Sequence, residues 1–395
     1  MTSLKETCQR LGLLARWLPR GIAGEAARKD VREMGGVMRV LLLHKYGRRA
    51  ASFRHRFEQY IPYLDEAGLQ CTVSSLLEED YLKDMFLADR RNLFAVMRGI
   101  FRRVRVLVGV RKYDLVIIGQ DLFPFAPAIF ERYLNIRGVP YIFDYDDPIF
   151  HQYDMHRSPA VRLLLGRKLQ AVIRGAELVF AGSPYIAAYA RVVNANVEYL
   201  PTVVDLEVFR QLKDHRVRNG QFVVGWIGSP STAVYLKALV PVLRRFCAST
   251  GARVVLVGSG PVDLPGVPTE IREWSEQTEV EEILRFDVGI MPMADDQWAR
   301  GKCGFKLVQY MACGLPIIAS PVGVSPVVVT DGVEGFLPPG DEGWLAAMHS
   351  LHADAELAAR MGRAARKRVE AAYCLQVTAP RFVAGVQRVL AGTPK

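Results

Sequence analysis

Two lysines spaced four residues apart, Lys302 and Lys306, have the residue type and the spacing to bind a diphosphate. Both belong to the segment 301–306 (Gly-Lys-Cys-Gly-Phe-Lys), which precedes an apolar stretch at 307–312 that predicts a helix. On a helix, residues four apart project from the same face, and two like charges there destabilise the helix unless an anion lies between them. We therefore expect an anion site at these lysines in preference to a solvated surface pair.

Glycine-rich turns occur three times in the second half of the chain, each before an expected helix: 228–232 (Gly-Ser-Pro-Ser-Thr), 258–261 (Gly-Ser-Gly-Pro) and 301–306. Glycine lets backbone N–H groups approach a ligand, and the N-terminus of a helix carries partial positive charge that attracts phosphate. One such turn is common in proteins. Three in one predicted sheet favour a phosphate-binding site.

Three carboxylates, Asp144, Asp146 and Asp147, lie where the predicted strand 139–144 ends. Their mutual repulsion is unfavourable unless another group uses them. They could orient a substrate hydroxyl or sugar, hold a divalent cation, or cap the turn between strand and loop.

Two basic segments lie in the first half of the chain. In the loop 45–54, Arg48 and Arg54 could bind an acidic or phosphorylated ligand or simply face solvent. The segment 90–112 has eight basic residues and no acidic one, with apolar residues between them at helical spacing. It predicts either a helix on an anionic membrane surface or a core helix with a solvated basic face.

Strands and helices alternate along most of the chain, and the strands are continuous apolar runs, as in a parallel sheet covered on both faces. We predict an α/β protein with two Rossmann-like, doubly wound domains that face each other across a cleft, with the site at the carboxyl ends of the strands. Helices are expected over 52–67, 81–109, 158–174, 354–372 and 377–391. The predicted parts are an N-terminal extension (1–36), an N-terminal domain (37–205), a C-terminal domain (206–375) and a final helix (376–395) that packs back towards the N-terminal domain. The extension is expected to be loosely attached, with a short interfacial helix as the alternative.

The composition excludes several classes of protein. With 395 residues, 50% of them hydrophobic and 23% charged, the chain is neither disordered nor a coiled coil. Six scattered Cys and seven His lack metal-ligand spacing, which argues against a disulfide scaffold or a zinc site and fits the cytoplasm. The net charge of +10 is carried mostly by residues 1–205, with 30 Lys and Arg against 22 Asp and Glu, but no nucleic-acid recognition motif accompanies it. Prolines and glycines interrupt the long uncharged stretch 307–330, so no membrane-spanning helix is expected.

A longer signature surrounds the second lysine. The run 307–323 (Leu-Val-Gln-Tyr-Met-Ala-Cys-Gly-Leu-Pro-Ile-Ile-Ala-Ser-Pro-Val-Gly), followed by 331–337 (Asp-Gly-Val-Glu-Gly-Phe-Leu), resembles the donor-binding signature of retaining glycosyltransferase family 4, of GT-B fold. The resemblance extends from Met38 to about Arg388. It implies a nucleotide-diphosphate sugar bound by the C-terminal domain and an acceptor bound by the N-terminal domain. It also implies front-face attack without a protein nucleophile, and no required metal or cofactor.

The sequence departs from this family at several positions. The two glutamates that most members carry eight positions apart correspond here to Gly301 and Gln309, and the Arg and Lys that usually follow the turn 228–232 are missing. Lys302 and Lys306 could replace the lost positive charge, and Gln309 could hydrogen-bond the ribose. Either Asp295 or Asp296 could contact the donor sugar. Asp146 falls where many members have an active-site His, whereas Asp144-x-Asp146 matches the acidic motif of metal-dependent GT-A enzymes.

The expected function is transfer of a sugar from a nucleotide-diphosphate sugar to a hydroxyl of a bacterial surface glycan or glycolipid, with retention. The expected catalytic residues are Lys302, Lys306, Asp146 and Asp147; the donor-binding residues are Gly228, Ser229, Gly258, Gly260, Asp296, Gly304, Phe305 and Gln309; the acceptor-binding residues are Gly47, Arg48 and Arg54. No metal site, cofactor or nucleic-acid partner is expected, and the protein would work in the cytoplasm or at the inner face of the cell membrane through 90–112. The alternatives are a catalytically silent nucleotide-sugar-binding or scaffold protein, and a nucleotide-sugar epimerase or phosphorylase on the same fold.

Overall fold

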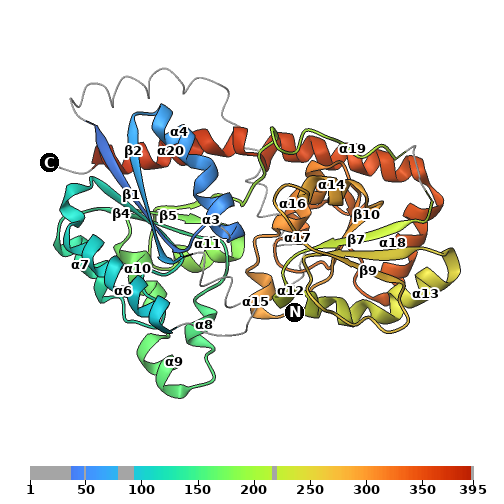
Figure 1. Cartoon of the computed structure of the whole chain (residues 1–395), viewed down its shortest axis with the longest axis horizontal. Helices are drawn as coiled ribbons and strands as arrows, with labels where there is room; N and C mark the ends of the chain where they lie inside the picture. The colour runs from blue at the N-terminus through green and yellow to red at the C-terminus, as the bar shows by residue number, and fades with distance from the viewer. Residues whose placement is uncertain (1–36, 49, 79–92, 216–219, 393–395) are drawn as a thin grey trace. The chain divides into compact units, whose positions relative to one another are not determined.

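The computed structural model describes residues 37–48, 50–78, 93–215 and 220–392 (Figure 1). The predicted extension 1–36 and the first part of the predicted helix 81–109 lie outside these residues. Residues 38–395 form one compact unit.

The first six strands form a parallel sheet in the order β2-β1-β3-β4-β5-β6. Every residue of its central strands β3 and β4 is buried, which explains why both are apolar in the sequence apart from Asp144. The strands are β1 (Met38–Tyr46), β2 (Leu69–Leu77), β3 (Leu115–Gly119), β4 (Tyr141–Tyr145), β5 (Leu178–Ala181) and β6 (Val197–Tyr199).

Two of the helices expected in this half are interrupted. Pro62 fixes the first turn of a new helix within the predicted 52–67, because proline fits the start of a helix but not its interior. The predicted 158–174 divides after Leu165. The helices are α3 (Ala51–Arg56), η2 (Glu58–Tyr60), α4 (Ile61–Glu66), α6 (Leu93–Val108), η3 (Val110–Lys112), α7 (Ile129–Ile136), α8 (His151–Asp154), α9 (Pro159–Leu165), α10 (Lys168–Gly175) and α11 (Pro184–Arg191).

The second sheet is also parallel, in the order β12-β11-β10-β7-β8-β9. Its strands are β7 (Val223–Ile227), β8 (Arg253–Val257), β9 (Thr269–Arg272), β10 (Val288–Met291), β11 (Ile317–Ala319) and β12 (Gly335–Phe336). Strand β9 is not evident from the sequence, since Thr-Glu-Ile-Arg is too polar to read as a buried run. The turn 258–261 therefore leads into a loop and then β9, and the prediction that a helix follows it is wrong.

The helices of the second half end with α20, at Gly392. They are α12 (Pro230–Ala233), η4 (Val234–Leu239), α13 (Val240–Thr250), α14 (Glu279–Leu284), α15 (Gln297–Arg300), α16 (Phe305–Ala312), α17 (Ser325–Val328), α18 (Asp341–Ala353), α19 (Ala355–Ala372) and α20 (Leu375–Gly392). The last two agree with the predicted helices 354–372 and 377–391 to within a few residues.

The final helix, α20, contacts elements of the first sheet. Phe382 stacks on Tyr60 with ring centroids 4.5 Å apart, and the Tyr60 hydroxyl lies 3.1 Å from Thr378 Oγ1. Arg381 donates a hydrogen bond to the carbonyl oxygen of Tyr199. The helix thus follows the second sheet in sequence but packs on the first, while the predicted domain boundaries stay a prediction.

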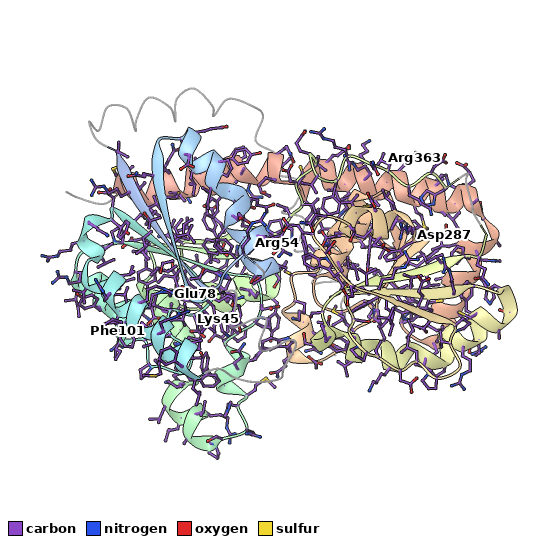
Figure 2. The ribbon with its side chains drawn as sticks, in the orientation of Figure 1. Lys45, Arg54, Glu78, Phe101, Asp287 and Arg363 are labelled. Atoms are coloured by element: carbon purple, nitrogen blue, oxygen red, sulfur yellow. The ribbon has the colours of Figure 1, made fainter. Side chains whose placement is uncertain are left out.

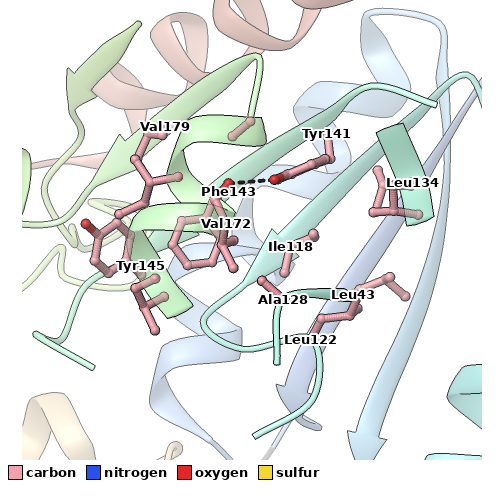
Figure 3. Close-up of a cluster of buried hydrophobic side chains, with 14 of the residues drawn as sticks. Leu43, Ile118, Leu122, Ala128, Leu134, Tyr141, Phe143, Tyr145, Val172 and Val179 are labelled. Atoms are coloured by element: carbon pink, nitrogen blue, oxygen red, sulfur yellow. Dashed lines mark hydrogen bonds between the residues drawn. The ribbon is translucent and has the colours of Figure 1, made fainter. Parts of the chain in front are cut away.

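Each sheet has its own buried apolar core. Ile118 and Val179 lie in the first, where the Tyr141 hydroxyl donates to the Val172 carbonyl oxygen across 2.5 Å (Figure 3). The second core gathers around Trp226, which is 1% exposed. Two separate cores, each under a doubly wound sheet, confirm the predicted fold class. Within the described ranges, no helix combines the length and apolar character needed to cross a bilayer.

Candidate active site

The strand order of the second sheet identifies where a ligand should bind. From β7 the chain winds to β8 and β9 on one side, and then returns to β10 on the other side of β7. The carboxyl ends of β7 and β10 therefore flank the point at which the winding reverses, and doubly wound sheets bind ligands in the crevice at this point. The segments that leave these two ends are 228–232 and 292–306.

Lys306 links these two segments. Its Nζ lies 3.4 Å from Thr232 Oγ1 and 5.4 Å from the centroid of the Trp226 ring. Gly228 makes room for the lysine stem, since a Cβ atom at this position would lie 2.4 Å from Lys306 Cε. Among the described residues, no carboxylate forms an ion pair with this ammonium group. Burial, and to a lesser extent the charge of Lys302, lower the pKa of Lys306 to about 8. An anion bound here would therefore stabilise the charged form of Lys306, which the surrounding protein does not do.

Lys302 has a different setting. Helix α16 begins at Phe305, after Gly304 in the left-handed region (φ 70°), so Lys302 lies in the preceding loop. The prediction that both lysines project from one helix face is therefore wrong. Lys302 Nζ lies 3.0 Å from Asp147 Oδ1 and 5.3 Å from the centroid of the Trp298 ring. Burial by itself would lower the pKa of Lys302, but Asp147 outweighs it and the pKa is raised.

The three aspartates at the end of β4 and just after it have separate environments. Asp144 is bound by Arg56 through Nε at 2.9 Å and Nη2 at 2.6 Å, and both side chains are 1% exposed. Asp146 accepts a hydrogen bond of 3.2 Å from Thr202 Oγ1, and burial, with the neighbouring Asp147 charge, raises its pKa to about 6. Asp144 is thus a structural partner of Arg56, and Asp146 and Asp147 are the carboxylates that remain for chemistry.

Gly301 contacts this same acidic loop. A Cβ atom on Gly301 would lie 2.4 Å from Pro148 Cβ, and Ser183 Oγ donates a hydrogen bond of 3.1 Å to the Gly301 carbonyl oxygen. This is the position at which the resemblance would place the first glutamate. No side chain fits there while the loop 144–148 remains in contact.

Gln309, at the position of the second glutamate, has a carboxylate beside it. Its side chain helps to lower the pKa of Glu279, which accepts a hydrogen bond of 2.6 Å from Trp274 Nε1. Burial raises the pKa of Glu279, and the side chains of Trp274 and Gln309 oppose the rise. Sequence reasoning missed Glu279, because six glutamates lie between 270 and 282 and nothing in their pattern singles it out.

The two arginines predicted to bind the acceptor contact the second domain. The Arg54 guanidinium lies 4.8 Å from the centroid of the Trp274 ring (Figure 2 labels Arg54). Arg48 Nε lies 2.7 Å from Glu58 Oε1 and its Nη2 lies 3.2 Å from Glu276 Oε1. The loop that contains Gly47 and Arg48 therefore lies against 274–276, and its role towards an acceptor stays a prediction.

The remaining predicted donor-binding residues surround Lys306 or cap neighbouring helices. Ser229 is exposed with its Oγ 2.9 Å from Ser231 Oγ. The turn containing Gly258 and Gly260 packs on 228–230, where a Cβ on Gly258 would lie 2.7 Å from the Gly228 carbonyl oxygen. Asp296 caps α15 by accepting from the Ala299 N–H at 2.8 Å, and the Phe305 ring lies 4.3 Å from that of His55.

A cavity of about 450 Å³ lies between α11 and the loops around α15, next to the Ser183–Gly301 contact. Tyr185 lines it, and the Tyr185 hydroxyl lies 2.9 Å from Nε2 of His151, whose Nδ1 lies 2.9 Å from Asp154 Oδ1. Arg300, bound to Asp295, also lines it. Sequence reasoning did not find this cavity, because its walls come from segments far apart in the chain: Pro184, Tyr185, Asp295, Arg300, Pro321, Val322, Gly323 and Val324.

A family model and several curated relatives match part of the chain. Residues 221–354 match the family model of the glycosyl transferases group 1. The D-inositol 3-phosphate glycosyltransferase of Mycobacterium marinum is 27% identical over 221 residues, which cover 50% of this chain and 46% of the relative. The protein of the same name from Kribbella flavida is 30% identical over 201 residues, covering 43% and 46%. The matched region thus spans less than half the length of these relatives.

Solved structures share the fold over nearly the whole chain. Anabaena HepE in complex with UDP-glucose has a TM-score of 0.64 and 16% identity, covering 89% of this chain and 99% of that chain. A glycosyltransferase from Rickettsia africae has a TM-score of 0.64 and 14% identity, covering 90% and 100%. Sucrose-phosphate synthase from Thermosynechococcus elongatus has a TM-score of 0.63 and 15% identity, covering 90% and 99%.

These structural matches agree with the two doubly wound sheets. The resemblance seen in 307–323 is confirmed, because this run lies inside the matched region. Residues 221–354 are thus similar to the glycosyl transferases group 1, and the chain has the GT-B fold.

Proposed function

We propose that the protein transfers a sugar from a nucleotide-diphosphate sugar to a hydroxyl acceptor with retained anomeric configuration. The observation that carries this proposal is Lys306, a partly buried ammonium group without an ion-pair partner among the described residues, at the winding reversal of the second sheet. Its lowered pKa is the expected signature of a cation that lacks its anion. Anabaena HepE, which shares the fold, was solved in complex with UDP-glucose, and this supports uridine diphosphate as the first nucleotide to test.

The diphosphate would lie between Lys306, the segment 228–232 and the N-terminal amides of α16. As the bond from the anomeric carbon to the diphosphate oxygen breaks, negative charge grows on the diphosphate, and fixed positive groups there stabilise the transition state. Lys302 would add a second positive charge when it exchanges Asp147 for the ligand. The acceptor oxygen would bond to the anomeric carbon on the face that the diphosphate leaves, and the acceptor proton would pass to the departing oxygen.

Asp146 and Asp147 would orient the acceptor hydroxyl. With a pKa of about 6, Asp146 is mainly ionised at neutral pH and able to accept a hydrogen bond from that hydroxyl. The cavity at Tyr185 lies next to this loop and offers phenol, guanidinium and carboxylate groups above apolar walls, a combination that suits a polyol ring. The relatives are named for an inositol phosphate acceptor, and a glycan or glycolipid of the cell surface has the same hydroxyl chemistry.

We propose that the reaction needs no metal and no cofactor besides the nucleotide sugar. We also propose that the protein works in the cytoplasm, and that it contacts the membrane if the acceptor is a glycolipid. The test is calorimetry of the purified chain against UDP-, GDP-, ADP- and TDP-glucose, followed by a product assay and measurement of the anomeric configuration. We expect one donor to bind, slow release of free sugar from it, and a retained product with an acceptor. Tight binding without any turnover would favour a silent nucleotide-sugar-binding protein, and an inverted product would contradict the mechanism.

A further inference from the structure

Helix α6 presents apolar side chains to solvent. Six large ones are between 37% and 76% exposed: Leu93, Phe94, Met97, Phe101, Val104 and Val108. With 3.6 residues per turn, all six fall within an arc of about 100° around the helix. Phe101 lies at the outer side of the first domain (Figure 2). Val96, Ile100, Val106 and Leu107, on the other face, pack against the first core. The exposed arc is therefore a second apolar face, which a surface helix of a globular protein normally lacks.

The opposite face of α6 fixes the helix in this orientation. Its buried residues are Gly99, Arg103 and Leu107. A Cβ atom on Gly99 would lie 2.1 Å from the Leu76 carbonyl oxygen. Arg103 donates to the carbonyl oxygens of His44 at 2.7 Å, Ser74 at 2.9 Å and Leu122 at 3.2 Å. The helix therefore cannot roll to bury its apolar arc without breaking these bonds.

Positive charge borders the apolar arc. Arg98, Arg102 and Arg105 follow it around the helix, and α6 contains no acidic residue. Glu78 binds Arg98 and Arg102, whereas Arg105 is exposed and has no carboxylate partner among the described residues. Arg111 and Lys112, also exposed, extend the positive charge just past the helix. An apolar arc with a cationic edge matches a lipid surface whose headgroups are anionic.

We propose that α6 docks the protein on an anionic membrane, with the apolar arc (residues 93, 94, 97, 101, 104 and 108) at the boundary between headgroups and acyl chains. The arginines would bind lipid phosphates at the edge of this arc. The inference rests on the proposed function only for the reason why docking would be useful. A docked enzyme would meet a glycolipid acceptor without leaving the membrane surface. A second copy of the chain is the competing occupant, and the residues 1–36 are another.

The experiment is co-sedimentation of the full chain with vesicles of phosphatidylcholine alone and of phosphatidylcholine with phosphatidylglycerol. We expect binding to the anionic vesicles that weakens with salt. Met97→Ser combined with Phe101→Ser should lower the partition coefficient at least about tenfold, and Arg105→Glu about fivefold. Val192→Ser, at a residue 77% exposed just after α11, and Arg363→Glu on α19 are the matched controls and should leave it unchanged.

Four outcomes would overturn the inference. The first three are equal binding to both kinds of vesicle, equal loss in the α6 and control variants, and a concentration-dependent dimer that Phe101→Ser abolishes. Loss of binding when residues 1–36 are removed, with α6 intact, would assign the membrane contact to that segment instead. Circular dichroism would verify that each variant is folded. Since donor binding is measured without lipid, failure here would leave the proposed transfer untouched.

Discussion

Lys302 of the second domain and Asp147 of the first form an ion pair of 3.0 Å, and this pair joins the loop before α16 to the loop after β4. The Lys302 side chain is 23% exposed and that of Asp147 33%. An ion pair this accessible to water contributes little stability, so it is suited to exchange partners when an anion arrives.

Asp147→Asn should therefore strengthen nucleotide binding while it slows transfer. The substitution frees Lys302 for the diphosphate, which we expect to lower the Kd for UDP by about threefold to tenfold, and it removes a carboxylate proposed to orient the acceptor. Calorimetry and initial rates measure the two effects. Lys302→Ala is the complementary variant and should raise the Kd; a weaker affinity in Asp147→Asn would exclude this exchange.

Lys306→Met should weaken diphosphate binding by at least about tenfold and stabilise the free protein at neutral pH. The pKa of Lys306 falls from 10.5 in the unfolded chain to about 8 in the folded one, so the unfolded chain binds more protons between these values. Stability should accordingly rise as the pH increases from 8 to 10.5, and nucleotide affinity should fall above about 8. Thermal unfolding and calorimetry across this range test both. Lys237→Met, an exposed lysine of η4, is the control; an identical pH profile in the two variants would contradict the assignment.

Gln309→Glu should destabilise the protein, because it places a second buried carboxylate against Glu279. We expect a loss of about 1–3 kcal/mol in the free energy of unfolding at neutral pH, and less in acid, where one of the pair is protonated. The double variant Gln309→Glu with Glu279→Gln exchanges the two groups and should recover most of the loss. Urea unfolding measures each, and a neutral single variant would mean that the two side chains do not interact.

Arg56→Met should be the most destabilising of these substitutions, because it leaves Asp144 buried without its partner. Arg56 also donates to the Leu200 carbonyl oxygen at 2.6 Å, so the segment that leaves the first domain is affected too. Loss of one member of a buried pair typically lowers the free energy of unfolding by about 3–5 kcal/mol. Breaking the exposed Arg363–Glu356 pair should change it by less than about 1 kcal/mol. Comparable values for the two pairs in denaturant titrations would contradict this ranking.

Tyr185→Phe should raise the KM for the acceptor several-fold and leave the Kd for the nucleotide unchanged. Tyr185 lines the cavity, and the substitution removes its hydroxyl, which lies 2.9 Å from Nε2 of His151. Steady-state kinetics with varied acceptor, set beside calorimetry with UDP, separates the two effects. A change in nucleotide affinity alone would indicate that the cavity binds the donor and not the acceptor.

The sequence predicts the fold well because each central strand is a buried apolar run, and the run 307–323 carries both α16 and β11. It does not predict β9, whose side chains are only partly buried. The spacing of Lys302 and Lys306 suggested one helix face, but the left-handed Gly304 starts α16 between them. Val324 packs against Gly304, where a Cβ atom would lie 2.5 Å from the Val324 side chain. This contact comes from tertiary packing and cannot be read from the local sequence.

The partners of the site residues were the least predictable. Asp144 and Asp146 look equivalent in the sequence, but of the two only Asp144 forms an ion pair with Arg56. Glu279 resembles its neighbours until the fold brings it to Gln309. Contacts between residues this far apart depend on strand order and loop path, which no local pattern encodes.

The close approach of Gly228 to Lys306 has a consequence for sequence variation. Any side chain at 228 would occupy the volume of the lysine methylenes, so the ammonium could not stay above the indole of Trp226. A larger residue at 228 is tolerable only if 306 becomes smaller and the cation is supplied from elsewhere. Substitutions at positions 228 and 306 should therefore be correlated among natural variants.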